Sequence, residues 1–392
     1  MAAMIGKFSQ IQGDRVGTTI TFDGAAASGT INLGIGQPSA DLLPVALLRD
    51  ASDAFFRQAQ PHELNYGPPS GDPRFLSSLA AYLSAAYAAE TDADSLFVTG
   101  GNSQALDLVS TVFAQPGDTV FVEEPSYFLA FQIFRDHGLN IVGIPLDHDG
   151  LDIGYLKNQL QIHRPAFLYT IPSYHNPGGQ CLSEVRRQQL LALSIEHDFL
   201  IVADEVYQLL SYNHTPPPAF GTLSGQGTVV SMGSFAKILA PGLRLGWIQT
   251  SPALRQKLLA NGFVNSGGCI NHYITHIVRL AIDLGLQAAH LETLRLAYHN
   301  RMEAMDKALQ QHFTGIAQWT RPAGGYFFWV RCHEHVDTAQ LRDRARELQT
   351  GFQPGIVFSS VNAFKNYMRL SFAHYTEDDI LEGVARIRKL FD

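Results

Sequence analysis

Several short motifs between residues 100 and 250 carry polar side chains, and each follows a segment rich in Val, Ile, Leu or Phe. The groups are the phenols of Tyr127 and Tyr207, the amide of Asn176, the carboxylate of Asp204, the hydroxyl of Ser234, the amine of Lys237 and the guanidinium of Arg244. A further motif, Gly100-Gly101-Asn102-Ser103-Gln104, opens a helix-like stretch, where free N–H groups favour an anion such as phosphate. Each motif alone has an ordinary structural reading, because most glycine turns are only turns and most lysines lie on the surface.

The apolar segments before these motifs predict short strands that alternate with amphipathic helices. We expect strands at residues 95–99, 119–123, 140–145, 166–171, 199–203, 228–232 and 243–249. This alternation predicts an α/β fold with a mostly parallel, mixed seven-stranded sheet and helices on both faces. In such sheets ligands bind beyond the carboxyl ends of the strands. The polar side chains should therefore meet at one edge of the sheet.

One cofactor, pyridoxal 5'-phosphate, needs all these groups at a single site. Its aldehyde takes a lysine as a Schiff base, and its ring nitrogen needs a buried carboxylate that keeps it protonated. Its phosphate needs helix N–H groups and a cation, for which Arg244, seven residues after Lys237, is suited by its fork of donors.

The remaining chain predicts longer helices and a second, smaller α+β domain. Helices are expected at residues 103–114, 183–197, 271–285, 291–313, 338–349 and 376–391, with Ser183 as a cap. Two apolar segments, 325–330 and 367–372, flank the fifth of these helices. We expect residues 1–50 to complete the small domain and the substrate pocket, 51–285 to form the large cofactor-binding domain, and 286–392 to form the C-terminal small domain.

The ordered motifs resemble those of fold-type I pyridoxal-phosphate aminotransferases of class I/II. The nearest branch contains the 2-aminoadipate and kynurenine aminotransferases and the catalytic domain of MocR-type regulators. The matching motifs are Asn65-Tyr66-Gly67-Pro68-Pro69-x-Gly71, Asn176-Pro177-x-Gly179, Asp204-x-x-Tyr207, Ser234-x-x-Lys237, Pro241-Gly242-x-Arg244-x-Gly246 and Met368-Arg369-Leu370-Ser371. The resemblance covers nearly the whole chain.

The resemblance implies a role for each matching residue. Lys237, Asp204 and Tyr207 are the expected catalytic residues, with Lys237 bound covalently to the cofactor and Asp204 paired with the ring nitrogen. Asn176 and Tyr207 would bind the ring hydroxyl, Tyr127 would stack on the ring, and Gly101, Asn102, Ser103, Gln104, Ser234 and Arg244 would hold the phosphate. Tyr66 would reach the phosphate of the neighbouring subunit, which implies a homodimer with shared active sites. Arg369, Gly36 and Asn176 would hold the substrate, with Arg369 on its α-carboxylate.

Two departures from the family pattern move or remove a hydroxyl. Ala236 stands before the lysine where related chains often have Ser or Thr, and the phosphate turn reads Gly-Gly-Asn-Ser-Gln where Ser-Gly-Ser-Gln-Gln is more usual. Both changes can alter how tightly the cofactor is held, but neither removes the lysine or the aspartate.

The expected activity is transfer of an α-amino group to a 2-oxo acid such as 2-oxoglutarate by a ping-pong mechanism. A lyase or decarboxylase on the same scaffold is the first alternative, since the cofactor serves those reactions equally. The second is an effector-sensing MocR-like domain, for which the early Asn65-Tyr66-Gly67 motif leaves no room for a DNA-binding domain before it. The donor stays open among aromatic, aliphatic and 2-aminoadipate-like amino acids. Residues 12–41, including Ile35, Gln37 and Asp41, should line its pocket, with Arg15 as a candidate for a second arginine.

Composition excludes other function classes. The 392 residues are 46% hydrophobic and 16% charged, with a formal net charge of -8 and no basic run, so nucleic acid is not an expected partner. The sequence predicts no membrane span and no export signal. Cys181, Cys269 and Cys332 have no metal-ligand spacing, which favours reduced thiols in the cytoplasm.

Two smaller features are interpreted as structural. His272 and His276 have i, i+4 spacing, but no third ligand accompanies them in the sequence, so no metal is expected. The run Pro216-Pro217-Pro218 is interpreted as a rigid loop.

Overall fold

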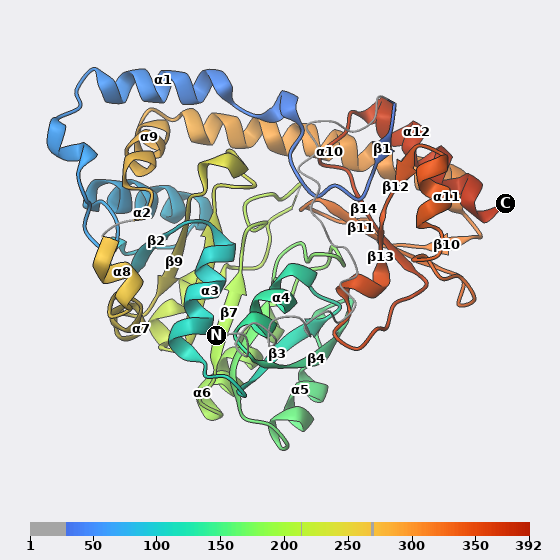
Figure 1. The fold of residues 1–392 in the computed structure, drawn as a ribbon, viewed down its shortest axis with the longest axis horizontal. Coiled ribbons are helices and arrows are strands. Elements are labelled where there is room, and N and C mark those ends of the chain that lie inside the picture. The colour runs from blue at the N-terminus through green and yellow to red at the C-terminus, as the bar shows by residue number, and fades with distance from the viewer. Residues whose placement is uncertain (1–28, 213, 268–269) are drawn as a thin grey trace, which may run out of the picture. The chain divides into compact units, whose positions relative to one another are not determined.

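The computed structural model describes residues 29–212, 214–267 and 270–392. Residues 31–392 form one compact unit, which is built around a large sheet (Figure 1). Across the sheet the strands are β2 (Leu96–Thr99), β9 (Gly246–Thr250), β8 (Val229–Ser234), β7 (Leu200–Asp204), β6 (Pro165–Thr170), β3 (Thr119–Glu124), β4 (Asn140–Asp147) and β5 (Gly150–Leu151). The five strands from β8 to β4 are parallel, whereas β9 runs antiparallel to both neighbours. All seven expected strands are present, and the two-residue β5 adds an eighth.

The helices of this unit have the following bounds. They are α1 (Val45–Phe56), α2 (Pro73–Tyr87), α3 (Asn102–Phe113), α4 (Phe128–Asp136), α5 (Ile153–Leu160), α6 (Glu184–Glu196), α7 (Pro252–Leu259), α8 (Gly262–Gly267), α9 (His272–Asp283), α10 (Leu286–Phe313), α11 (Arg342–Glu347) and α12 (Glu377–Arg388). The predicted cap is confirmed, because the Ser183 hydroxyl accepts the Arg186 N–H at the start of α6.

Side chains of the central strands alternate between two apolar layers. Val202 on β7 belongs to the core that includes Leu106 of α3 and Phe131 of α4. The next residue towards the N-terminus, Ile201, belongs to a second core with Leu190 of α6. Because successive side chains of a strand point to opposite faces, helices must cover both faces of this sheet.

The smaller domain contains a four-stranded antiparallel sheet. Its order is β10 (Ala317–Gln318), β11 (Phe327–Cys332), β14 (Tyr367–Ser371) and β13 (Gln353–Pro354). Figure 1 shows these strands beside α11 and α12, with the long α10 running towards them. The pair β1 (Ile31–Asn32) and β12 (Thr350–Gly351) brings the N-terminal segment to the C-terminal one. Both ends of the described unit therefore build the small domain, while the boundaries at residues 50 and 285 remain predictions.

Two helices differ from their expected lengths. Helix α10 begins at Leu286, five residues earlier than expected, after Gly285 separates it from α9 with a φ of +73°. Helix α11 covers only Arg342–Glu347 of the expected range 338–349. The hydroxyl of buried Thr338 donates to the carbonyls of Lys365 and Tyr367, which ties this segment to the start of β14 and delays the helix.

Among the described residues, no helix combines the length and apolar character that crossing a membrane requires.

Candidate active site

Three of the predicted site residues lie at the carboxyl ends of strands of the large sheet. Asp204 is the last residue of β7, Ser234 is the last residue of β8, and Asn102 opens α3 just after β2. Strands β7 and β8 run parallel, so their carboxyl ends open on the same edge of the sheet. Lys237 follows β8 by three residues and extends from that edge.

The Lys237 amine lies within a buried polar network. Its Nζ donates to the carbonyl oxygen of Gly36 at 2.9 Å and stands 5.3 Å from the ring centre of Tyr326. Burial lowers the pKa of this amine from 10.5 to about 8, and the positive charge of Arg369 acts in the same direction, while Asp204 opposes it. With this pKa about a tenth of the amine is neutral at pH 7, against less than a thousandth for an ordinary lysine, and a general base or nucleophile requires the neutral form.

The Asp204 carboxylate is buried, and each of its oxygens accepts a side-chain hydrogen bond. Asn102 Nδ2 donates to Oδ1 at 2.7 Å, and the Tyr169 hydroxyl donates to Oδ2 at 2.9 Å. Burial raises the pKa of Asp204, while these two hydrogen bonds, a backbone hydrogen bond from Val206 and the charge of Lys237 lower it. The arrangement presents a carboxylate to a cationic partner inside the protein.

Arg369 places a guanidinium in the same region, from the middle of β14. Its Nη1 donates to Asn176 Oδ1 and its Nη2 to the Gly34 carbonyl, both at 2.9 Å. The guanidinium carbon lies 4.1 Å from the ring centre of Phe327 and 5.0 Å from that of Phe358. Burial lowers the pKa of Arg369 to about 10, and its Nε has no hydrogen-bond partner. This fork suits a carboxylate that enters beside Gly36.

The expected phosphate cup lies at the N-terminus of α3. Gly101 precedes this helix with a φ of +89°, and a side chain there would put Cβ 3.2 Å from Arg244 Nη2. Arg244 Nη2 donates to the Gly100 carbonyl at 3.2 Å. The Ser234 hydroxyl accepts the N–H of Ala236 at 3.1 Å.

The other polar side chains of the turn are directed differently. Gln104 Oε1 accepts the Gly100 N–H at 3.0 Å, and Ser103 is exposed. The Asn102 side chain binds Asp204 and the Met232 carbonyl. At this turn the candidate phosphate-binding site is therefore formed mainly by backbone N–H groups and less by side chains.

Three tyrosines of the prediction occupy different environments. Tyr207 is buried and packs edge-on against Tyr326 and Phe327, and burial raises its pKa. Tyr127 lies at the start of α4, and burial raises its pKa to about 12, with the charge of Asp204 acting in the same direction. Tyr66 is 83% exposed, so its side chain faces outward from this subunit.

Comparisons with known proteins identify the family of this chain. Residues 28–387 match the family described as aminotransferase class I and II. The chain belongs to this family. An aromatic-amino-acid aminotransferase of Thermococcus litoralis is 33% identical over 366 residues, which span 92% of this chain and 87% of the relative.

Two solved aminotransferase structures have the same fold as this chain over more than nine tenths of its length. The multiple substrate aminotransferase of Thermococcus profundus has a TM-score of 0.87 at 32% identity, over 93% of this chain and 91% of that one. The alpha-aminoadipate aminotransferase of Thermus thermophilus, solved with N-(5'-phosphopyridoxyl)-L-leucine, has a TM-score of 0.85 at 30% identity, over 93% and 92%. The chain is a pyridoxal-phosphate-dependent enzyme that transfers amino groups.

The donor set of the aminotransferase fits this cofactor. Gly101 leaves open the space beside Arg244 that a Cβ would fill, which suits a phosphate against helix N–H groups. Asp204 offers a buried carboxylate for a protonated ring nitrogen. Lys237 offers an amine with a lowered pKa for an aldehyde.

Four aromatic residues of the site were missed by the sequence analysis. They are Tyr169, which donates to Asp204, Tyr326, which packs under the Lys237 amine, and Phe327 and Phe358, which flank Arg369. Tyr169 lies within the predicted strand 166–171, and Tyr326 and Phe327 lie within the predicted apolar segment 325–330, where aromatic residues are ordinary core residues. No local signal distinguishes them, because their partners lie on other elements.

Three of the sequence predictions fall partly outside the described residues. The N-terminal segment 1–50 and the pocket segment 12–41 do so before residue 29, which includes Arg15, and of the three cysteines Cys269 lies outside. Within the described residues, Cys181 and Cys332 are free thiols.

The expectation that His272 and His276 lack a third neighbour is wrong. Packing of α2 on α9 brings Asp72, and the potential ligand atoms of the three residues lie within 4.8 Å of one another. The Asp72 carboxylate is already engaged, however, because it accepts the N–H groups of Arg74 and Phe75 at the start of α2 and faces the Arg74 guanidinium at 3.4 Å. We interpret the cluster as a structural contact between the two helices.

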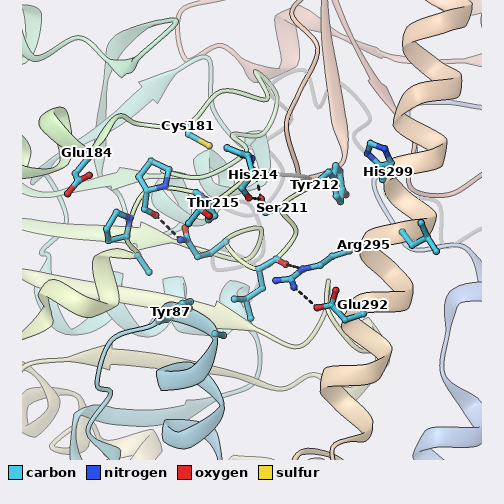
Figure 2. A pocket seen from close by; sticks show the side chains of 18 residues that line it. Tyr87, Cys181, Glu184, Ser211, Tyr212, His214, Thr215, Glu292, Arg295 and His299 are labelled. Carbon is cyan, nitrogen blue, oxygen red and sulfur yellow. Dashed lines mark hydrogen bonds and ion pairs between the residues drawn. The ribbon is translucent and has the colours of Figure 1, made fainter.

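A hollow of about 1220 Å³ lies apart from this site (Figure 2). Its lining residues include Pro216, Pro217 and Pro218 but none of the predicted site residues. Gln208 Nε2 donates to the Pro217 carbonyl, and Arg187 Nη1 donates to the Pro218 carbonyl, both at 2.9 Å. Buried side chains thus hold this loop in place, in agreement with its interpretation as rigid.

Proposed function

We propose that Lys237 binds pyridoxal 5'-phosphate covalently and that the amino group of the substrate displaces it, after which the freed Lys237 amine would serve as the general base that moves the α-proton of the amino acid. The overall reaction would pass the amino group to a 2-oxo acid such as 2-oxoglutarate in two half-reactions. The observation that carries the proposal is the convergence of Lys237, Gly36 and Arg369. The Gly36 carbonyl accepts from Lys237, and a Cβ on Gly36 would lie 3.5 Å from Arg369 Nη2.

The roles of the residues follow from their chemistry. The bound cofactor supplies an electron sink for negative charge at the substrate α-carbon. Asp204 keeps the ring nitrogen protonated, and Arg369 holds the substrate carboxylate with the help of Asn176 and Gly36. Lys237, with its lowered pKa, takes the proton in its neutral form and returns it as an ammonium.

The remaining site residues would hold the cofactor in place. Tyr207 and Asn176 bind the ring hydroxyl, and Tyr127 covers the ring. Gly101, Asn102, Ser103, Gln104, Ser234 and Arg244 surround the phosphate. Tyr66 of the partner subunit completes that cup in a homodimer, which is consistent with its exposure in the single subunit.

For the donor we propose aromatic, aliphatic and 2-aminoadipate-like amino acids. The names of the relatives support the first and third classes. The aromatic rings of Phe327 and Phe358 beside Arg369 support donors with apolar side chains. A cytoplasmic location remains a prediction from the sequence.

The absorption spectrum of the purified protein tests the proposal. We expect a yellow band that is absent from Lys237→Ala and that bleaches when single amino acids are added without an acceptor. The amino acids that bleach it identify the donors. A wild-type protein that shows no such band after incubation with pyridoxal phosphate and removal of the unbound cofactor would overturn the proposal.

Mixed dimers test the shared site separately. Tyr66→Ala and Lys237→Ala are each expected to have little activity alone. Unfolding and refolding them together should restore about a quarter of the wild-type activity, because half of the dimers then carry one intact site. No recovery, with mixed dimers shown by differential tags, would exclude the contribution of Tyr66 across the interface.

A further inference from the structure

The side chain of Asn102 connects three parts of the active site. Asn102 is the first residue of α3 and directly follows Gly101. Its Nδ2 donates to Asp204 Oδ1 at 2.7 Å and to the Met232 carbonyl at 3.1 Å. One amide therefore joins the start of α3 to the end of β7 and to β8.

The orientation of this amide is determined by its partners. A carboxylate and a carbonyl accept hydrogen bonds only, so the NH₂ group must face them. The other amide atom, Oδ1, is buried without a hydrogen-bond partner. Leaving a buried acceptor without a partner is unfavourable, so Oδ1 does not favour this position. The two hydrogen bonds donated by Nδ2 therefore determine where the Asn102 side chain lies.

We propose that Asn102 is a positioning residue for Asp204, which it holds ionised and aimed at the ring nitrogen of the cofactor. This inference rests on the proposed function. It departs from the expectation that the Asn102 side chain serves the phosphate, because the amide hydrogens are already committed to Asp204 and Met232.

The physical reason lies in the burial of Asp204, which is only 7% exposed. A buried carboxylate tends to take up a proton unless donors compensate for the lost water. Asn102 and Tyr169 supply one donor to each oxygen. Because Asn102 also contributes a backbone N–H at the start of α3, one residue would link the phosphate end of the cofactor to its ring nitrogen.

Binding of two cofactors to the apoenzyme tests the inference. The first is pyridoxal 5'-phosphate, and the second is its analogue with carbon in place of the ring nitrogen. Dissociation constants are measured by fluorescence titration for the wild type and Asn102→Ala. The control is Thr111→Ala, on an exposed position of the same helix, where the hydroxyl contacts only the Asp107 carbonyl.

We expect Asn102→Ala to weaken binding of pyridoxal phosphate about ten- to a hundredfold, the range for a lost hydrogen bond to a charged group. Binding of the analogue should change less than threefold, because the analogue has no ring nitrogen for Asp204 to bind. Thr111→Ala should leave both constants unchanged. Equal weakening for both cofactors would overturn the inference and assign Asn102 to the phosphate.

A second variant covers the case in which Asn102→Ala fails to fold. Asn102→Asp keeps the size of the side chain but places a carboxylate against Asp204, so one of the two must be protonated. Its affinity for pyridoxal phosphate, relative to that of the wild type, should rise as the pH falls from 8 to 5. A ratio that does not depend on pH would contradict the inference, whereas a wild type that binds no cofactor would overturn the proposed function itself.

Discussion

Replacement of Lys237 by methionine should stabilise the cofactor-free protein near neutral pH. The folded protein lowers the pKa of Lys237 from 10.5 to about 8. Each pKa unit corresponds to about 1.36 kcal/mol, so holding the charged amine in the fold costs about 3 kcal/mol below pH 8. Methionine removes this cost but also loses the hydrogen bond to Gly36, which contributes about 1 kcal/mol. The expected net gain at pH 7 is about 2 kcal/mol.

The sign of this effect should change with pH. Between pH 8 and 10.5 the unfolded chain holds the Lys237 proton more tightly than the folded protein, so wild-type stability rises with pH there. A methionine side chain does not titrate, so it adds no such rise to the stability of the variant. The stability advantage of Lys237→Met over the wild type should therefore shrink by about 1.4 kcal/mol per pH unit. Above pH 10.5 only the lost hydrogen bond remains, which makes the variant less stable by about 1 kcal/mol.

Urea unfolding followed by circular dichroism, at pH values from 7 to 10.5, measures this difference. The cofactor must first be removed from the wild type, because binding to the folded state adds stability of its own. Lys257→Met on α7 is a matched control, because Lys257 is exposed and should show no crossover. A difference between wild type and Lys237→Met that stays constant from pH 7 to 10.5 would refute the burial argument.

Three further predictions concern neighbouring residues. Arg369→Gln should raise the KM for amino-acid donors about a hundredfold, and Arg369→Lys about tenfold, because lysine keeps the positive charge but lacks the paired N–H donors of a guanidinium. Initial-rate measurements give both KM values, and an unchanged KM in either variant would contradict the role of Arg369. Tyr169→Phe removes the donor to Asp204 Oδ2 and should weaken binding of pyridoxal phosphate about tenfold in equilibrium titrations, and an unchanged constant would show that Asp204 does not need it. Gly36→Ala places a Cβ 3.0 Å from Phe327 Cζ and 3.5 Å from Arg369 Nη2. The KM for the amino-acid donor should therefore rise about tenfold, while the melting temperature stays nearly unchanged. A KM equal to that of the wild type would mean that Phe327 moves away freely.

The sequence alone determined the layered α/β architecture and the edge at which the chemistry lies. Buried parallel strands are continuous apolar runs, and the polar residues that follow them must meet at the carboxyl ends. Asp204, Ser234 and Lys237 were therefore predictable from their positions at or just beyond the carboxyl ends of β7 and β8. The ends of α10 and α11 were less predictable, since Thr338 delays α11 by contacts with residues nearly thirty positions away.

Only the tertiary structure decided which side chains surround these groups. Asn102 and Asp204 are 102 residues apart, and Arg369 and Asn176 are 193 apart, yet each pair forms a direct hydrogen bond. No local pattern encodes such pairs, because the fold of the whole chain sets the distance between their strands. The lowered pKa of Lys237 has the same origin: it arises from burial and from the charge of Arg369, which folding brings to the amine from another domain.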